Sequence, residues 1–167
     1  RDIQMVFQMP MESFDPRCTL GDGIGECLRN MGISRTETRR KVEELLERCG
    51  LEKEYADRYP YQVSGGQCQR AAIARALAVN PSILICDEAT SALDVTVQKQ
   101  ILELLIELKK KENFSFILIC HDLALVQAFC DRVLVLYHGK TVESGTPDET
   151  IDHPQMDYTR KLIDSVL

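Results

Sequence analysis

The sequence predicts an α/β fold, in which helices flank a mainly parallel sheet and a small helical subdomain accompanies it. From Ser64 to Tyr137, short continuous apolar runs alternate with longer segments of helical spacing, as in layered parallel sheets. The stretch from about 22 to 62 has helical spacing and turn residues but no strand pattern. We therefore expect a helical subdomain at about 22–62, an α/β core at about 63–145 and a helical extension at 146–167.

The first part of the chain predicts one strand and one capped helix. Residues 3–7 form a short apolar run typical of a strand, and a loop rich in proline follows. Ser34 and Glu37 have the spacing of a capping box, which predicts that a helix begins there. Gly50 suits the C-terminal end of that helix, because glycine adopts the left-handed conformation without steric cost.

The middle of the chain predicts helix, strand, helix and strand in turn. A helix follows Ser64, and Pro81 stops it. Residues 82–86 predict a buried strand, residues 95–111 an amphipathic helix, and residues 114–120 a second continuous apolar strand. This alternation is the basis of the parallel-sheet prediction.

The last part predicts a helix, a hairpin and a terminal helix. The helix covers 122–130, and the hairpin strands at 132–137 and 140–143 flank His-Gly at 138–139, which suits a two-residue turn. An amphipathic pattern at 157–166 predicts the terminal helix.

Length and composition exclude several classes of function. A chain of 167 residues can bury its own core. Its formal net charge of -6 gives no bulk attraction for nucleic acid or anionic lipid, so no nucleic-acid partner is expected. No apolar run reaches the roughly 20 residues that a membrane-spanning helix needs, so direct membrane insertion is not expected. The seven cysteines form no C-x-x-C pair, and we expect them to be small hydrophobes of a reducing compartment.

Two acidic residues, Asp87 and Glu88, directly follow the predicted strand at 82–86. Open α/β sheets bind ligands at the carboxyl ends of their strands. One carboxylate can hold Mg²⁺, which prefers oxygen ligands, and its neighbour can accept a proton from an attacking water. Taken alone, the pair suits helix-capping acids equally well.

Four residues at a predicted helix start, Ser64, Gly65, Gly66 and Gln67, have the features of an anion site. The glycines let the backbone approach an anion closely, and the N–H groups and dipole of the helix start favour phosphate. An isolated Ser-Gly-Gly is more usually a helix N-cap with flexible glycines.

Three further polar residues stand at the boundaries of predicted elements. Gln8 follows the first strand, and His121 follows the strand at 114–120. Asp94 precedes the helix at 95–111. Each alone has a plain structural explanation, as a surface amide, a capping or core histidine and a helix N-cap respectively.

In combination, these motifs resemble the ATP-binding cassette (ABC) ATPases, which have a P-loop NTPase-like fold. The resemblance rests on Ser-Gly-Gly-Gln at 64–67, the strand that ends in Asp87 and Glu88, and Ser-Ala-Leu-Asp at 91–94, in that order. It covers the chain from Gln4 onward. The cofactors that the resemblance implies are ATP and Mg²⁺.

The resemblance implies a role for each candidate residue. Asp87 and Gln8 would ligate Mg²⁺, and Glu88 would act as the general base. His121 would be the switch histidine, which contacts the γ-phosphate of ATP and orients the water and the base. Gln8 would also link the nucleotide site to a membrane partner, and Asp94 would couple two active sites across a dimer.

The resemblance also implies partners and a location. Ser64, Gly65, Gly66 and Gln67 would contact the γ-phosphate of ATP held by an opposing subunit. The partners would be a second ABC ATPase subunit and transmembrane permease subunits. The protein would then be cytoplasmic and peripheral on the inner face of the cell membrane.

The detailed pattern resembles the branch of oligopeptide, dipeptide and nickel importers. Gln-Met-Val-Phe-Gln at 4–8, Ser-Phe-Asp-Pro-Arg at 13–17 and the segment 143–147 carry this resemblance. Met9 stands where that branch usually has Asp, and Val63 replaces the common Leu. Peptides or metal complexes are the substrates that this branch implies.

One motif of the family is absent from these 167 residues: they contain no G-x-x-x-x-G-K-[ST] loop. That loop provides most of the cradle for the β- and γ-phosphates. The chain also begins at Arg1 and enters a strand directly, which predicts a cassette truncated at its N-terminus. We expect such a chain to bind ATP weakly and to hydrolyse it negligibly. Because apolar faces and a sheet edge would be exposed, we also expect it to self-associate, to swap elements or to need a complementing fragment.

Two other functions are consistent with the motifs. A truncated cassette could be a non-hydrolysing interaction module that pairs with an intact cassette. A non-transport ABC ATPase of the DNA-repair type is a weaker alternative, because only a short helical stretch separates Gln8 from Ser64 and the chain is acidic.

Overall fold

The computed structural model describes residues 2–88, 93–111 and 114–165. The chain falls into two compact units, Arg1–Ile119 and Cys120–Leu167, and each is described by itself. The division lies at Cys120, inside the stretch 63–145 expected to form one α/β core. The helical part and the sheet, expected as separate parts, belong to the same unit.

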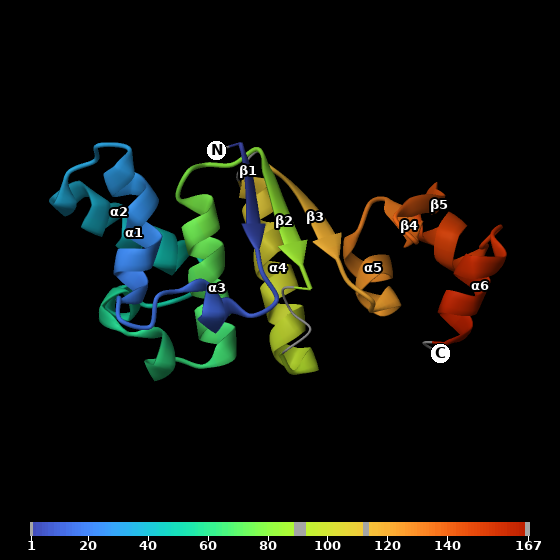
Figure 1. Ribbon diagram of the computed structural model, residues 1–167, viewed down its shortest axis with the longest axis horizontal. Coiled ribbons are helices and arrows are strands. Elements are labelled where there is room, and N and C mark those ends of the chain that lie inside the picture. Colours follow the sequence, from blue (N-terminus) through green and yellow to red (C-terminus); the bar gives the residue numbers. More distant parts are fainter. Residues whose placement is uncertain (1, 89–92, 112–113, 166–167) are drawn as a thin grey trace. The chain divides into compact units, whose positions relative to one another are not determined.

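A three-stranded parallel sheet forms the centre of the first unit, in the order β1-β2-β3 (Figure 1). The strands are β1 (Ile3–Val6), β2 (Ile83–Asp87) and β3 (Ser115–Ile119). Ile83 of β2 pairs with Ile3 on one side and with Ser115 on the other, so all three strands run in register. The prediction of a parallel α/β sheet is confirmed.

Helices cover one face of this sheet. The two that do so are α3 (Gly65–Leu77) and α4 (Val95–Lys111), and α4 lies behind the strands in Figure 1. The bounds of α4 agree with the prediction from helical spacing. The side chains buried between these helices and the strands include Val6, Leu84, Cys86, Ile101, Leu102, Leu105 and Leu108.

The opposite face of the sheet is largely open. Ile3, Ile117 and Ile119 are 55%, 50% and 47% exposed, although each lies within a strand. The continuous apolar run at 114–120 predicts a buried strand, whereas β3 alternates between exposed and half-buried residues. The reason is that the described helices of this unit pack against only one face, so every second apolar side chain remains in water.

The helical part of the first unit consists of α1 (Leu20–Asn30), α2 (Arg35–Arg48) and the short turns η1 (Pro10–Ser13), η2 (Lys53–Asp57) and η3 (Pro60–Gln62). Thr19 and Ser34 cap the two helices: Thr19 Oγ1 accepts from the Asp22 N–H at 3.1 Å and Ser34 Oγ from the Glu37 N–H at 3.3 Å. Gly50 follows the end of α2 with a φ of 72°, as its identity predicts. The inward side chains of this part include Leu20, Ile24, Leu28, Val42 and Leu46, all buried.

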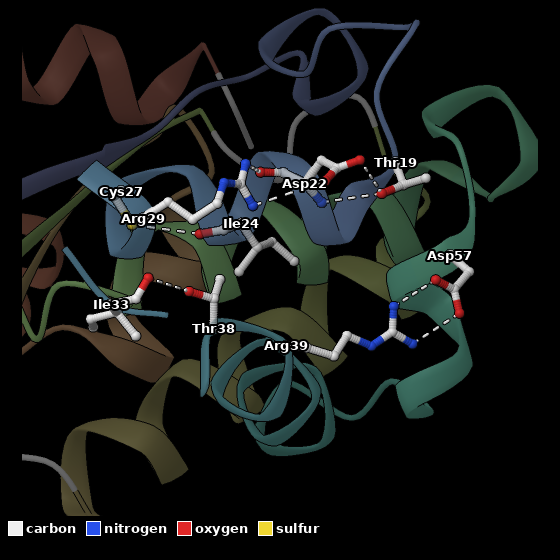
Figure 2. Close-up of polar contacts among 9 residues, drawn as sticks. All are labelled: Thr19, Asp22, Ile24, Cys27, Arg29, Ile33, Thr38, Arg39 and Asp57. Atoms are coloured by element: carbon white, nitrogen blue, oxygen red, sulfur yellow. Dashed lines mark hydrogen bonds and ion pairs between the residues drawn. The ribbon is translucent and has the colours of Figure 1, made fainter. Parts of the chain in front are cut away.

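Ion pairs and hydrogen bonds close the surface of this helical part. Arg39 of α2 donates from both Nη atoms to the Asp57 carboxylate, at 2.5 and 2.9 Å, and so ties α2 to η2 (Figure 2). Arg29 of α1 donates to the backbone carbonyl of Asp22 at 2.8 Å within the same helix (Figure 2). A cavity of about 570 Å³ is lined by Arg29, Arg39 and their neighbours. Both guanidinium groups already have a carboxylate partner, Asp22 for Arg29 and Asp57 for Arg39.

The second unit contains α5 (Leu123–Phe129), the hairpin strands β4 (Val133–Tyr137) and β5 (Lys140–Gly145), a short helical turn η4 (Asp148–Asp152) and α6 (Asp157–Asp164). The predicted two-residue turn is confirmed: Tyr137 pairs with Lys140, and residues 138 and 139 have φ values of 45° and 75°. α6 ends at Asp164, and residue 166 of the predicted terminal helix lies outside the described residues.

In the part of the chain that the structure describes, no helix is long and apolar enough to cross a bilayer.

Candidate functional site

The carboxyl ends of the three strands define one edge of the sheet, and the candidate residues of the first unit gather there. Gln8 lies two residues beyond β1, Asp87 ends β2, and Glu88 follows it. A short connection leads from the end of α3 to the start of β2, so α3 runs antiparallel to the strands and its first residue lies at this same edge (Figure 1). The same argument places Asp94, immediately before α4, at this edge.

The loop at 64–67 forms a reciprocal capping box. The Ser64 N–H donates to Gln67 Oε1 at 2.8 Å, and the Gln67 N–H donates to Ser64 Oγ at 3.3 Å. The start of a helix has four N–H groups without intrahelical partners, and this box satisfies two of them. The other two belong to Gly65 and Gly66, so the glycines present the donors that an anion would use.

The side chain of Gln67 is used inside the chain at both ends. While Oε1 accepts from Ser64, Nε2 donates to the Tyr55 hydroxyl at 2.8 Å, which ties α3 to η2. In this structure, therefore, Gln67 shapes the loop. Its predicted contact with a phosphate stays a prediction, whereas Ser64 retains a hydroxyl proton to donate.

The two glycines pack against the start of α4. A Cβ added to Gly65 would lie 3.3 Å from Leu93, and one added to Gly66 would lie 2.7 Å from Val97. Side chains at these positions would therefore push α3 away from α4, most severely at Gly66. Close packing is a second reason for glycine here, beside access for an anion.

Asp94 has the structural role that its position predicts. Its Oδ1 accepts from the Val97 N–H at 3.0 Å, and its carbonyl accepts from the Gln98 N–H at 2.9 Å, so it caps α4. Coupling across a dimer, the other role implied for Asp94, stays a prediction. Ser91 and Ala92, the first half of the Ser-Ala-Leu-Asp motif, lie outside the described residues.

Glu88 adopts a backbone conformation that the sequence does not reveal. Its φ is 43°, in the left-handed region, and its N–H donates to the Ile119 carbonyl at 2.9 Å, which extends the ladder between β2 and β3. Such a conformation costs a residue other than glycine about 1–3 kcal/mol and is most common at functional sites. It turns the chain directly after Asp87.

The described residues contain no group of three or more His, Cys, Asp or Glu side chains placed to hold a metal ion. The oxygens of Asp87 and Gln8 would still suffice for Mg²⁺. That ion is usually held by one or two protein oxygens and takes its other ligands from water and phosphate. Asp87 and Gln8, both at the carboxyl edge, would supply those oxygens.

His121 lies in the second unit, two residues beyond β3. Its side chain is exposed. The next residue, Asp122, caps α5 by accepting from the Ala124 and Leu125 N–H groups at 2.9 and 3.2 Å. The capping function at this position therefore belongs to Asp122, and the role implied for His121 stays a prediction.

The cysteines do not contribute chemistry to this site. All seven are free. Burial raises the pKa of Cys68, in α3, to about 11 and that of Cys86, in β2, to about 12, so both thiols stay protonated near neutral pH. Cys18 is exposed and departs from the expectation of burial.

Two residues that support the site escaped the sequence analysis. Tyr55 holds the Gln67 amide, and nothing in its sequence context predicts this contact. Arg75 lies in α3 and contacts the loop that follows Gln8. A cation within the run of small apolar residues at 71–78 is the signal that could have identified Arg75.

Comparison with known proteins decides the family. The family model described as "ABC transporter" matches residues 1–91, more than half of the chain. The chain belongs to the ABC transporter family. The resemblance inferred from the motifs and the predicted fold class are both confirmed.

Curated relatives of this ABC chain include two ATP-binding proteins, one named for transport and one for import. It is 48% identical to the oligopeptide transport ATP-binding protein OppF of Escherichia coli K12, over 99% of this chain and 50% of OppF. It is also 48% identical to the glutathione import ATP-binding protein GsiA of Pectobacterium atrosepticum, over 99% of this chain and 27% of GsiA. The chain thus spans half the length of the first relative and about a quarter of the second.

A solved structure supports the fold. The ATP-binding cassette MJ0796, determined as a dimer in a post-hydrolysis state with ADP and Pi, matches with a TM-score of 0.76 and 32% sequence identity. The match covers 87% of this chain and 63% of the MJ0796 chain.

Proposed function

We propose that this chain is the part of an ABC importer's ATP-binding subunit that carries the loop beginning at Gln8, the loop at 64–67, here called the signature loop because it begins the signature helix α3, and the carboxylates of Asp87 and Glu88. The observation that carries the proposal is the capping box at 64–67, which leaves the Gly65 and Gly66 N–H groups for an anion. At the same edge of the sheet stand two carboxylates, Asp87 and Glu88. Anion donors, a metal ligand and a base are the groups that hydrolysis of a nucleoside triphosphate needs.

The residues divide the chemistry between them in this proposal. Asp87 and Gln8 would hold Mg²⁺, which would supply the positive charge that neutralises phosphate oxygens. Glu88 accepts the proton of the attacking water. His121 donates a hydrogen bond to the γ-phosphate and orients the water.

The signature loop would act on ATP that a second subunit holds. Ser64 donates its hydroxyl proton, and the two glycines donate their N–H groups, to the γ-phosphate. Gln67 holds this loop in place, and Asp94 joins the two sites across the dimer. The dimeric state of MJ0796 supports a paired arrangement.

Transport of small peptides is the function that the relatives favour. The names of the two relatives specify oligopeptide transport and glutathione import, and glutathione is itself a small peptide. Import of metal complexes, such as nickel complexes, is the second possibility within the same branch. In either case, permease subunits would bind the substrate, and this subunit would lie on the cytoplasmic face of the membrane through them.

An interaction module is the second candidate function, and one observation favours it. The signature loop is completely formed here, although these 167 residues include no phosphate-binding loop. Such a chain could pair with an intact cassette and supply signature donors without hydrolysing ATP at its own site. A DNA-repair type ABC ATPase is not favoured, because the relatives are named for import.

The test is ATP hydrolysis by the full-length subunit, compared with a Glu88→Gln variant. We expect turnover of roughly 1 per second or more for the subunit and a loss of about 100-fold or more in the variant, with ATP binding retained. A Glu103→Gln variant serves as control, because Glu103 is an exposed residue of α4 far along the helix from Asp94. Turnover that Glu88→Gln leaves unchanged would contradict the proposed base.

The same assay separates the two candidate functions. If the full-length subunit shows no turnover alone but stimulates or inhibits an intact cassette, the interaction module is correct.

A further inference from the structure

Arg75 makes a set of contacts that connects two motifs of the proposed site. It lies in α3, the helix that begins at Gly65, and reaches the segment 10–14, which begins two residues after Gln8. Its Nη1 donates to the Ser13 carbonyl, and its Nη2 donates to Ser13 Oγ at 2.9 Å. The Ser13 hydroxyl in turn donates to the Pro10 carbonyl at 2.7 Å, so both ends of η1 are held.

The guanidinium also contacts an aromatic ring. Arg75 Cζ lies 4.3 Å from the centre of the Phe14 ring, within the range of a cation–π contact. Phe14 is only 4% exposed, and a Cβ added to Gly23 of α1 would lie 2.7 Å from its Cδ1. The ring therefore lies between Arg75 and α1, with little freedom to move.

Lysine could not reproduce this arrangement. Burial lowers the pKa of Arg75, and a partly buried cation needs several partners to compensate for lost hydration. Here one planar group donates two hydrogen bonds and also lies over an aromatic ring. An ammonium group has neither the fork nor the flat face.

We propose that Arg75 is a positioning residue, which fixes the loop after Gln8 to the signature helix so that the two motifs move as one body. The proposal rests on the proposed function for what Gln8 and the signature glycines bind. A movement of Gln8, the proposed metal ligand, would then reach the N–H donors of Gly65 and Gly66 through the Arg75 side chain. Arg75 and its partner Ser13 are 62 residues apart in the sequence. Arg75 itself touches neither ATP nor Mg²⁺.

The first test measures the clamp without any ligand. In the 167-residue chain, Arg75→Lys should speed amide hydrogen exchange at 10–14 by about tenfold or more, since each hydrogen bond to a charged group contributes about 1.5–3 kcal/mol. The matched control is Arg70→Lys in the same helix. Arg70 donates to the Cys49 carbonyl at 3.0 Å, so this change should loosen the end of α2 and leave 10–14 protected.

Unchanged exchange at 10–14 in Arg75→Lys would overturn the clamp. If that variant does not fold, Ser13→Ala and Phe14→Leu replace it. The first removes the hydroxyl that accepts from Arg75, and the second removes the ring over which Arg75 lies. Each should speed exchange at 10–14 by a smaller factor, and unchanged exchange in both would overturn the clamp equally.

The second test measures coupling in the full-length subunit. With folded molecules counted by ATP-binding stoichiometry, Arg75→Lys should lower kcat by about tenfold and change the KM for ATP by less than about twofold. A purely structural role would lower the amount of folded protein and leave kcat per folded molecule unchanged, which would overturn the proposal. Absence of turnover in the unsubstituted subunit would contradict the proposed function instead, while the exchange experiment would still report on the clamp.

Discussion

The helical part and the sheet of the first unit differ in how completely they are packed. In the helical part, apolar side chains of α1 and α2 face one another and are buried, and the charges at the rim are paired. In the sheet, one face is buried beneath α3 and α4, while the other leaves Ile117 and Ile119 about half exposed, at 50% and 47%. The helical part therefore buries its own apolar side chains. One face of the sheet does not, and it is available for contact with another protein surface.

The sharpest test of this difference compares two alanine substitutions in neighbouring strands. Leu84→Ala, on the covered face, should lower the free energy of unfolding by about 2–5 kcal/mol, because the cavity it leaves cannot fill. Ile117→Ala, on the open face, should cost less than about 1 kcal/mol, because the side chain is already half in water. Urea unfolding followed by circular dichroism measures both, and equal losses would show that the open face is covered in solution.

The open face also predicts association. A patch of apolar side chains on a sheet favours contact with another copy, so the chain should self-associate at micromolar concentration. Ile117→Lys should weaken this association, whereas Lys99→Ala, on the exposed side of α4, should not. Light scattering measures the mass, and a monodisperse monomer of the unsubstituted chain would contradict the prediction.

A smaller effect is expected where the signature loop meets α4. Gly66→Ala should lower the free energy of unfolding by about 1 kcal/mol. Overpacking against Val97 costs about 1–3 kcal/mol, and the better helix propensity of alanine offsets up to about 1 kcal/mol of that cost. Gly65→Ala should be nearly neutral, since its added Cβ would lie 3.3 Å from a flexible leucine instead of 2.7 Å from a β-branched valine. Thermal unfolding distinguishes the two, and an equal effect of both substitutions would refute the packing argument.

The smallest effect concerns the rim of the helical part. Hydrogen bonds from Arg39 lower the pKa of Asp57 below its ordinary value. A lowered folded pKa means that the pair stabilises the fold fully above the unfolded pKa of about 3.9, and that this contribution disappears as pH falls through the folded pKa. Because Asp57 is largely exposed, Asp57→Asn should cost less than about 1 kcal/mol at pH 7, and this cost should shrink as the pH falls below about 3.9.

Asp15 provides the control for this pH dependence. Its partner Arg17 is only two residues away, so the pair can persist in the unfolded chain. Asp15→Asn should leave the pH dependence of unfolding unchanged, and a steeper change there than at Asp57 would contradict the account.

Local patterns were enough to predict most elements and the edge where the site lies. Helical spacing predicted the bounds of α4, and glycine chemistry predicted the end of α2 at Gly50, because both depend on neighbouring residues. Strand order then placed Gln8, Asp87 and Glu88 together. What escaped prediction depends on tertiary contact: the open face around Ile117 and the Arg75 clamp join segments far apart in the sequence.

The backbone of Glu88 escaped prediction for a different reason. Nothing in its sequence context favours a positive φ, and glycine or asparagine would be the usual residue in that conformation. The surrounding ladder imposes the conformation on a glutamate, so its strain becomes visible only in the structure.

In our proposal this chain supplies the N–H donors of Gly65 and Gly66 and the carboxylates of Asp87 and Glu88. These 167 residues do not include the phosphate-binding loop that would hold ATP. The most direct measurement is calorimetric titration of Mg-ATP into the 167-residue chain and its Glu88→Gln variant, which cannot consume the ligand. We predict no saturation below about 1 mM in either protein, because the free energy of binding should be weaker than about -4 kcal/mol. A dissociation constant of about 10 μM or less, from this chain alone, would contradict the account.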